Sequence, residues 1–218
     1  AKRGLPLEAV QRYGLGYIEG EDNTGKYLYR QRAAFGLPPK ERDGKPVRAL
    51  RIPRGITIPC WSDGDHTQAL RVRIRKRNAD LAEGEDKYIL IAQPAPPYSA
   101  PLRLAPIGVA PELATWSVVE SELDAMLIHH ACGGKIGALA ILTASGKPDA
   151  VAHAALSAAA RILMVMDWDA KPDGDIPTAS NWRWWRDRYP QAKLWPVPAG
   201  KDPGEAFAKG VDIREVTD

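Results

Sequence analysis

The sequence predicts an α/β fold: a parallel (doubly wound) sheet with helices on both faces, preceded by a smaller mixed α+β basic subdomain. Three short apolar runs, at 115–119, 136–142 and 162–166, are rich in large aliphatic and β-branched residues, as buried strands are. Two helix-like segments, 121–132 and 148–160, separate these runs. The order strand, helix, strand, helix, strand is typical of a parallel sheet.

Acidic residues follow two of these predicted strands. Glu120 comes directly after the first run, and Asp167 and Asp169 come after the third. Because the carboxyl ends of parallel strands meet at one edge of a sheet, we expect these carboxylates to lie close together. Like charges at short range repel unless a cation neutralises them, and all-oxygen ligand sets favour magnesium or manganese (Mg2+ or Mn2+). The alternative is that the acids only end strands and begin turns.

The acids also carry a family resemblance. Glu-Ser-x-x-Asp-Ala from Glu120 to Ala125, followed by Asp-x-Asp-Ala from Asp167 to Ala170, resembles the Toprim domain of primases, topoisomerases and related nucleases. The family usually has Gly where this chain has Ser121 and Lys171. The resemblance implies a Toprim-type sheet in which Glu120, Asp167 and Asp169 are catalytic, and in which these residues and Asp124 bind the metal.

Composition and charge limit the class of protein. The 218 residues suffice for one large domain or two small ones, and no apolar run approaches the ~20 residues of a membrane span. The opening Ala-Lys-Arg-Gly predicts an excised fragment without a signal peptide. Cys60 and Cys132 lie far apart, which predicts reduced thiols in a cytoplasmic protein and no zinc site in this chain.

The charge is unevenly divided between two predicted domains. Residues 1–110 hold 19 Lys and Arg against 12 Asp and Glu, whereas residues 111–218 hold 11 against 15. Residues 93–114, with six prolines, are predicted to be an irregular connector, and this connector sets the boundary between the two domains. We expect 1–110 to be an N-terminal basic subdomain that binds template and nucleotide, and the resemblance implies that 111–218 is the Toprim metal-binding catalytic domain. A basic half joined to an acidic, metal-binding half suits a polyanionic substrate.

The N-terminal segment resembles the opening of the catalytic core in DnaG-type primases. An Arg-Gly at Arg3 precedes a short predicted helix with Leu7, Val10 and Tyr13 on one face, and an aromatic-Gly-x-Gly-aromatic turn follows from Tyr13 to Tyr17. The resemblance implies that Arg3 faces the active-site cleft. Residues 19–55 show no sustained period and predict a variable excursion, for which a hairpin over the basic face is one interpretation.

A β-hairpin with an arginine row is predicted next. Residues 56–61 and 69–77 form its strands, and in the second strand Leu70, Val72 and Ile74 alternate with four arginines. These arginines are Arg71, Arg73, Arg75 and Arg77. Their spacing of about 6–7 Å is near that of phosphates along a single nucleic-acid strand. The alternative is an edge strand that uses charge against aggregation, although a nearly pure Arg row favours phosphate binding.

Two further motifs resemble DnaG-type primases. Lys87-Tyr88 matches a Lys-Tyr pair that follows an arginine, here Arg75 or alternatively Arg73. Gly-Lys-Asp-Pro-x-Glu, with Lys201 and Asp202, matches a motif that starts a helix beside the metals. The resemblance implies that Asp202 assists metal binding and that the basic residues and Tyr88 contact template or nucleotide. Gly204 replaces the second Asp of the family motif.

Residues 180–189 interleave aromatic residues with arginines. Trp182, Trp185 and Tyr189 fall on one helical face, which favours a helix packed on the sheet. Trp184 lies off that face and is expected to be exposed. The alternative is that these aromatics stack the bases of a single nucleic-acid strand.

Together the motifs imply the catalytic core of a DnaG-like primase from a phage or mobile element. The expected activity is metal-dependent, DNA-templated synthesis of short RNA primers, with single-stranded DNA and nucleoside triphosphates as partners, a replicative helicase reached through missing regions, and no membrane. In this reaction Arg3, Arg75 and Lys87 would neutralise phosphates, and Glu120 would be a metal ligand or a general base. The alternatives are a Toprim nuclease that cleaves DNA with the same metals and a non-catalytic nucleic-acid-binding module.

Overall fold

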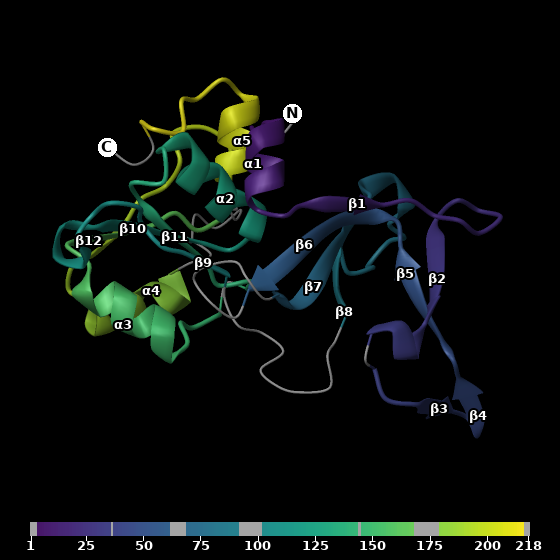
Figure 1. The fold of residues 1–218 in the computed structure, drawn as a ribbon. Coiled ribbons are helices and arrows are strands. Elements are labelled where there is room, and N and C mark those ends of the chain that lie inside the picture. The colour runs from purple at the N-terminus through teal and green to yellow at the C-terminus, as the bar shows by residue number, and fades with distance from the viewer. Residues whose placement is uncertain are drawn as a thin grey trace. The chain divides into compact units, whose positions relative to one another are not determined.

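The computed structural model describes residues 4–35, 37–61, 69–91, 102–143, 145–167 and 179–215. It divides into two compact units, one formed by Val10–Ser99 and the other by Ala1–Ala9 with Ala100–Asp218. The first nine residues thus belong with the C-terminal part. The main segment of that unit begins at Ala100, before the domain boundary predicted at residue 110. Figure 1 shows the elements of both units.

The C-terminal unit is built on a five-stranded sheet in the order β13-β12-β10-β11-β9. Its strands are β9 (Leu102–Leu104), β10 (Thr115–Val119), β11 (Gly137–Ala140), β12 (Arg161–Met164) and β13 (Ala192–Leu194). Strand β10 runs parallel to β11 and β12, and β12 runs parallel to β13. The predicted parallel sheet is confirmed. Strand β9 adds an antiparallel edge beside β11.

Helices cover both faces of this sheet (Figure 1). Helices α3 (Ala150–Ala158) and α4 (Ala179–Arg188) pack on one face, and α2 (Glu122–Ala131) and α5 (Pro203–Ala208) lie on the other. Because strand side chains alternate between faces, Trp116 and Val118 join the core under α3 and α4. Ser117 and the alanines of β11 point to the opposite face, where their small size lets α2 approach closely.

Helix α4 packs by the face that the sequence indicates. Trp185 and Tyr189 are each 1% exposed and belong to the core cluster, and Trp182 packs against it. Trp184 is 36% exposed. The core interpretation of this segment is therefore confirmed, and one aromatic side chain is left at the surface.

The N-terminal segment packs within the C-terminal unit but differs from its predicted pattern. Helix α1 spans Leu7–Arg12. Of the three residues that the sequence places on one helical face, only Tyr13 is buried, whereas Leu7 is 71% exposed and Val10 is half-buried. Gly4 adopts a positive φ of 74°, and a Cβ there would lie 2.7 Å from Leu127. Only glycine lets the chain pass this close to α2 in that conformation.

The other unit, Val10–Ser99, contains a four-stranded antiparallel sheet in the order β1-β6-β7-β8. Its strands are β1 (Gly16–Ile18), β6 (Gly55–Trp61), β7 (Ala69–Lys76) and β8 (Tyr88–Ile91). The predicted hairpin of β6 and β7 is present as an antiparallel pair. On β7, Ile74 is fully buried and Lys76 is 5% exposed, with its Nζ 2.6 Å from Glu85.

The excursion at 19–55 has more regular structure than the single hairpin that the sequence suggested. It holds two antiparallel pairs: β2 (Tyr27–Gln31) with β5 (Ala49–Pro53), and β3 (Lys40–Arg42) with β4 (Lys45–Val47). The short 3-10 helices of the chain are η1 (Arg32–Phe35), η2 (Asn78–Asp80) and η3 (Pro111–Leu113). Among the described helices, none is long and apolar enough to cross a membrane.

Candidate metal centre

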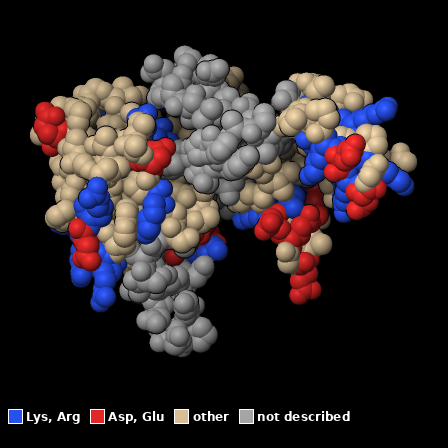
Figure 2. Space-filling view, turned by 90° about the horizontal axis from the view of Figure 1, so that it is seen from below, with Lys and Arg blue, Asp and Glu red and all other residues tan. Residues whose placement is uncertain are grey.

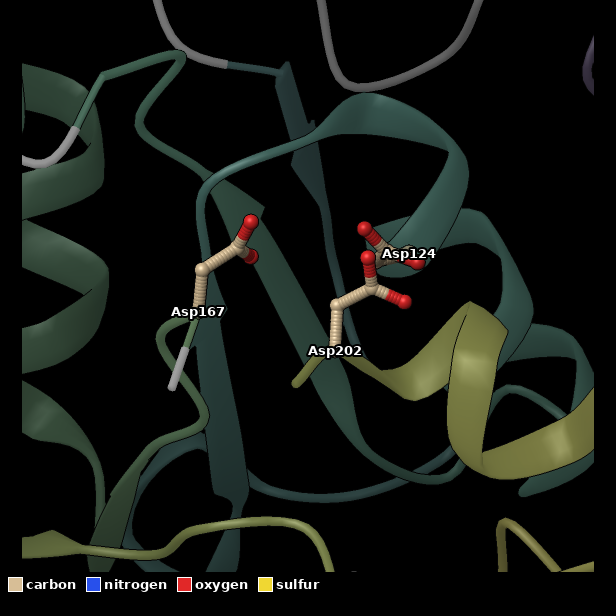
Figure 3. A group of neighbouring side chains, drawn as sticks. All are labelled: Asp124, Asp167 and Asp202. Atoms are coloured by element: carbon tan, nitrogen blue, oxygen red, sulfur yellow. The ribbon is translucent and has the colours of Figure 1, made fainter. Parts of the chain in front are cut away.

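Three buried or half-buried aspartates converge in the C-terminal unit. Asp124, Asp167 and Asp202 each offer a carboxylate oxygen, and these oxygens all lie within 4.8 Å of one another. Figure 3 shows their side chains pointing toward a common space from three separate segments. A cluster of three carboxylate oxygens at this range is the donor set that hard divalent cations prefer.

The fold accounts for the position of each aspartate. Asp167 follows β12, and Glu120 follows the neighbouring parallel strand β10, so both stand at the same edge of the sheet. Ser121 caps α2, which places Asp124 in its first turn. Asp202 caps α5 with a side-chain oxygen that accepts from the Glu205 backbone N–H at 2.7 Å. Three elements thus deliver one carboxylate each.

Asp124 is fixed by donors from two elements. The Ser121 hydroxyl donates to Oδ2 of Asp124, and the backbone N–H of Gly204 donates to Oδ1 over 3.1 Å. Ser121 Oγ in turn accepts from the Asp124 backbone N–H at 3.3 Å. Asp124 is only 3% exposed, so these bonds set the direction of a carboxylate with little freedom to move. They also tie the start of α5 to α2.

The charges at the site disfavour ionisation of Asp167. Burial, and after it the carboxylates of Glu120, Asp124 and Asp202, together raise the pKa of Asp167 to about 7, although Lys201 acts in the opposite direction. The ionised form is therefore held back by lost hydration and by like charge. A divalent cation among these oxygens would reverse both effects, and the residues present fit such an ion.

The other predicted acids differ in how the structure places them. Glu120 is half-buried and lies close enough to act on the pKa of Asp167. Asp169 and Arg3 lie outside the described residues, so their predicted roles stay predictions. Lys201 is half-buried beside the cluster, one residue before Asp202.

The arginine row lies on a central strand. Strand β7 is paired with β6 on one side and β8 on the other, so the alternative of an edge strand guarded by charge is wrong. The side chains of Arg71 and Arg73 lie outside what the structure describes. Arg77 follows the end of β7 and is exposed.

Arg75 has a buried donor that no described residue satisfies. Its Nη2 donates to Oδ1 of Asn78 at 3.2 Å, whereas its Nε is buried without a hydrogen-bond partner in the part of the chain that the structure describes. Tyr88 on β8 stands opposite Arg75 in the strand register, and Lys87 directly precedes it. Arg75 and Tyr88 are therefore neighbours in this sheet, and the roles that the resemblance implies for Arg75, Lys87 and Tyr88 stay predictions.

Sequence reasoning missed the two donors that position Asp124. Ser121 was noted only as a departure from the family glycine, and Gly204 only as the replacement of an acid. The spacing Ser121-x-x-Asp124 is a helix-capping signature and could have identified the first contact. The second joins residues 80 positions apart, and no local pattern signals it.

The whole fold is shared with solved primase structures. No protein-family model matches the chain, and no curated protein does. The RNA polymerase domain of primase DnaG from Mycobacterium tuberculosis is similar over 99% of this chain and 72% of that chain, with a TM-score of 0.63 and 16% identity.

Two other solved structures are similar at comparable levels. A DnaG primase catalytic domain bound to single-stranded DNA matches with a TM-score of 0.58 and 17% identity over 96% of this chain and 68% of that one. The zinc-binding and RNA polymerase domains of the Aquifex aeolicus primase match with a TM-score of 0.57 and 15% identity, over 98% of this chain and 52% of that one. These likenesses establish the fold, including the parallel sheet predicted from the sequence.

Proposed function

We propose that this chain is a primase catalytic core, which copies single-stranded DNA into short RNA primers by metal-dependent nucleotidyl transfer. The observation that carries the proposal is the convergence of Asp124, Asp167 and Asp202 within 4.8 Å, in a chain with the fold of primase RNA polymerase domains. The sequence motifs that resemble Toprim and DnaG-type cores support the same reading. The DnaG domain solved with single-stranded DNA supports the choice of template.

In this proposal the carboxylates hold magnesium or manganese. Asp124, Asp167 and Asp202 would be ligands together with Asp169, and Glu120 would be a further ligand or the general base for the attacking hydroxyl. The bound cations would supply a lowered pKa at the primer 3′-hydroxyl and charge neutralisation at the leaving pyrophosphate. Ser121 and the N–H of Gly204 orient Asp124 for this task.

Cationic side chains would bind the polyanionic substrates. Arg75 is the best supported, because its buried Nε has no hydrogen-bond partner among the described residues, which is costly, and a phosphate oxygen would satisfy it. The same role is proposed for the other basic residues of the motifs and for Tyr88, which would contact template or nucleotide. They are Arg3, Arg71, Arg73, Arg77, Lys87 and Lys201.

Incorporation of labelled nucleotides into RNA on a single-stranded DNA template tests the proposal. The chain should incorporate nucleotide only with Mg2+ or Mn2+, and Asp167→Asn or Asp169→Asn should abolish incorporation without unfolding the protein. Asp212→Asn is the matched control, because Asp212 contacts Arg214 away from the cluster. Unchanged incorporation in Asp167→Asn and Asp169→Asn would exclude this function.

Cleavage and binding assays with labelled DNA separate the two alternatives. Incubation of labelled DNA with metal and without nucleoside triphosphates would yield cleavage products if the chain were a Toprim nuclease. Binding of DNA without incorporation or cleavage would indicate a non-catalytic module. A replicative helicase as partner, a phage or mobile-element origin and a cytoplasmic location remain predictions from the sequence.

A further inference from the structure

One aromatic side chain of α4 stands at the surface beside basic groups. Trp184 is 36% exposed, whereas its neighbour Trp185 is buried in the core. The Trp184 ring meets Trp185 edge to face, with centroids 5.1 Å apart and an angle of 86°, and approaches Tyr189 at 6.1 Å and 73°. Two buried rings therefore hold an exposed indole in a fixed orientation.

One cationic group contacts this indole, and another lies one helical turn away on the same helix. Lys147 places its Nζ 4.1 Å from the centre of the Trp184 ring. Arg188, one helical turn after Trp184 on the same side of α4, donates to Nε2 of His153 at 2.6 Å. Nδ1 of His153 lies 2.7 Å from the Tyr189 hydroxyl, so the guanidinium is tied to the residues that support the indole.

Basic side chains are exposed on the side of the C-terminal unit that carries these groups. Figure 2 views the molecule from the side on which α3 and α4 lie, and Lys and Arg side chains stand out over part of the C-terminal unit, with Asp and Glu side chains among them. Arg183 and Arg186 are also exposed on α4, and the acid on this helix, Asp187, lies 3.3 Å from Arg186. Lys147, Trp184 and Arg188 are called the Trp184 patch below.

We propose that the Trp184 patch binds single-stranded nucleic acid, with one base against the indole and the adjoining phosphates on Lys147 and Arg188. A fixed aromatic ring flanked by cations is the arrangement that binds single strands without sequence preference. The patch lies on the face of the sheet opposite α2 and α5, which carry Asp124 and Asp202. It is therefore separate from the candidate metal centre and does not depend on the function proposed for it.

The chemistry favours a nucleic acid over a protein partner. An acidic protein segment would use the cations but would leave the indole without a flat partner, whereas every base offers one. Lys147 is an exposed residue, and partial desolvation lowers its pKa where its Nζ lies 4.1 Å from the centre of the Trp184 ring. A phosphate beside Nζ would stabilise the charged form and draw the lysine off the indole, which frees that face for a base.

Binding of two strands that differ only in their bases tests the patch. Fluorescence anisotropy of the whole chain in EDTA, without nucleotides, is measured with labelled oligothymidine and with an abasic strand of the same length. Trp184→Ala should weaken oligothymidine binding by roughly five-fold or more and leave abasic binding unchanged. Trp184→Phe should retain most of the preference for oligothymidine.

The cationic part of the patch gives a second readout. Lys147→Gln should weaken both strands and lower the salt dependence of log K by about 0.7. Lys209→Gln, an exposed residue at the end of α5 on the opposite face, should leave that slope unchanged. If Trp184→Ala left both affinities unchanged, or weakened both strands equally, the indole would serve only to cover the core or to contact a protein. Either result would overturn the proposal.

Discussion

Asp124 is the residue at which the local and the distant parts of the candidate site meet. Its own helix supplies one donor, Ser121, and the start of α5 supplies the other, the N–H of Gly204. Such outer contacts fix the orientation of a ligand before any metal arrives, and their loss weakens metal binding more than it weakens the fold. Ser121 therefore has two separable roles, as a helix cap and as a donor to the carboxylate.

Ser121→Ala separates these roles. It should lower the free energy of unfolding by about 1 kcal/mol, because α2 loses its cap. It should also weaken Mn2+ binding roughly ten-fold, because Asp124 loses one of its donors. Urea denaturation and Mn2+ titration by electron paramagnetic resonance measure the two effects.

Asp149→Ala is the matched control for Ser121→Ala. Asp149 caps α3 by accepting from the Ala152 backbone N–H at 2.8 Å, and it is not part of the aspartate cluster. Its loss should cost a similar stability of about 1 kcal/mol without changing Mn2+ affinity. Equal Mn2+ affinities in the two variants would show that Ser121 acts on the fold alone.

The raised pKa of Asp167 predicts a pH dependence of stability in the metal-free protein. A carboxyl group with a pKa near 7 in the fold and near 3.8 in the unfolded chain binds more protons when folded. The contribution of Asp167 to the free energy of unfolding is therefore most favourable at low pH and is lost as pH rises from about 4 to about 7. Asp167→Asn removes the titration, so its advantage in Tm over wild type in EDTA should grow from pH 5 to pH 7 and then level off. A constant difference in Tm across this range would contradict the assigned environment.

At the scale of elements, the sequence predicts the strands and helices whose hydrophobic pattern matches the burial of their side chains. The strands β10, β11 and β12 are buried on both faces, so their runs are continuously apolar and were found from the sequence. A hairpin was suggested for 19–55, but the bounds and pairing of β2 and β5 were missed because they form an isolated pair in which β2 has no buried side chain, so no alternation marks it. Leu7 was misplaced because it stands outside the buried face of a helix of only 6 residues.

The candidate site was predictable only in part, because some of its residues are placed by strand order and others by contacts between distant segments. The acids after β10 and β12 follow from the topology, since both strands end at one edge. Asp202 was placed by a resemblance, and its approach to Asp124 depends on how α5 packs on α2. That packing is a long-range contact that hydrophobic periodicity does not encode.

The contact between β10 and β11 gives a prediction at this scale. Gly137 pairs with Trp116, and a Cβ at Gly137 would lie 2.5 Å from Cε2 of the indole. Gly137→Ala should therefore lower the free energy of unfolding by about 1–3 kcal/mol, because the buried ring must shift. In a Trp116→Leu background the same change should cost less than about 1 kcal/mol, since the obstructing ring is gone. Additive effects in urea denaturation would show that the two residues do not collide.

At the scale of the whole molecule, the basic surplus of residues 1–110 and the acidic cluster of the C-terminal unit suit a substrate that is itself a polyanion. Because β7 is a central strand, its arginines are not there to block pairing at a sheet edge. Their remaining interpretation is contact with phosphates, for which the buried Nε of Arg75 is the strongest sign.

Replacing both Arg73 and Arg75 with Gln tests this interpretation. The double variant should bind single-stranded DNA more weakly and lower the slope of log K against log salt by about 1.4, the sum of two phosphate contacts on a single strand. Arg214→Gln is the control, because that guanidinium is held by Asp212 in the acidic half of the chain. A wild-type slope in the double variant would mean that the arginine row does not contact DNA.

The metal centre is the claim on which the proposed catalysis depends, and anomalous scattering from crystals soaked in Mn2+ tests it most directly. The carboxylates of Asp124, Asp167 and Asp202 converge within 4.8 Å, so an anomalous peak should stand among them and should disappear in Asp124→Asn crystals of unchanged fold. An intact fold with no peak at these carboxylates under saturating Mn2+ would contradict the account.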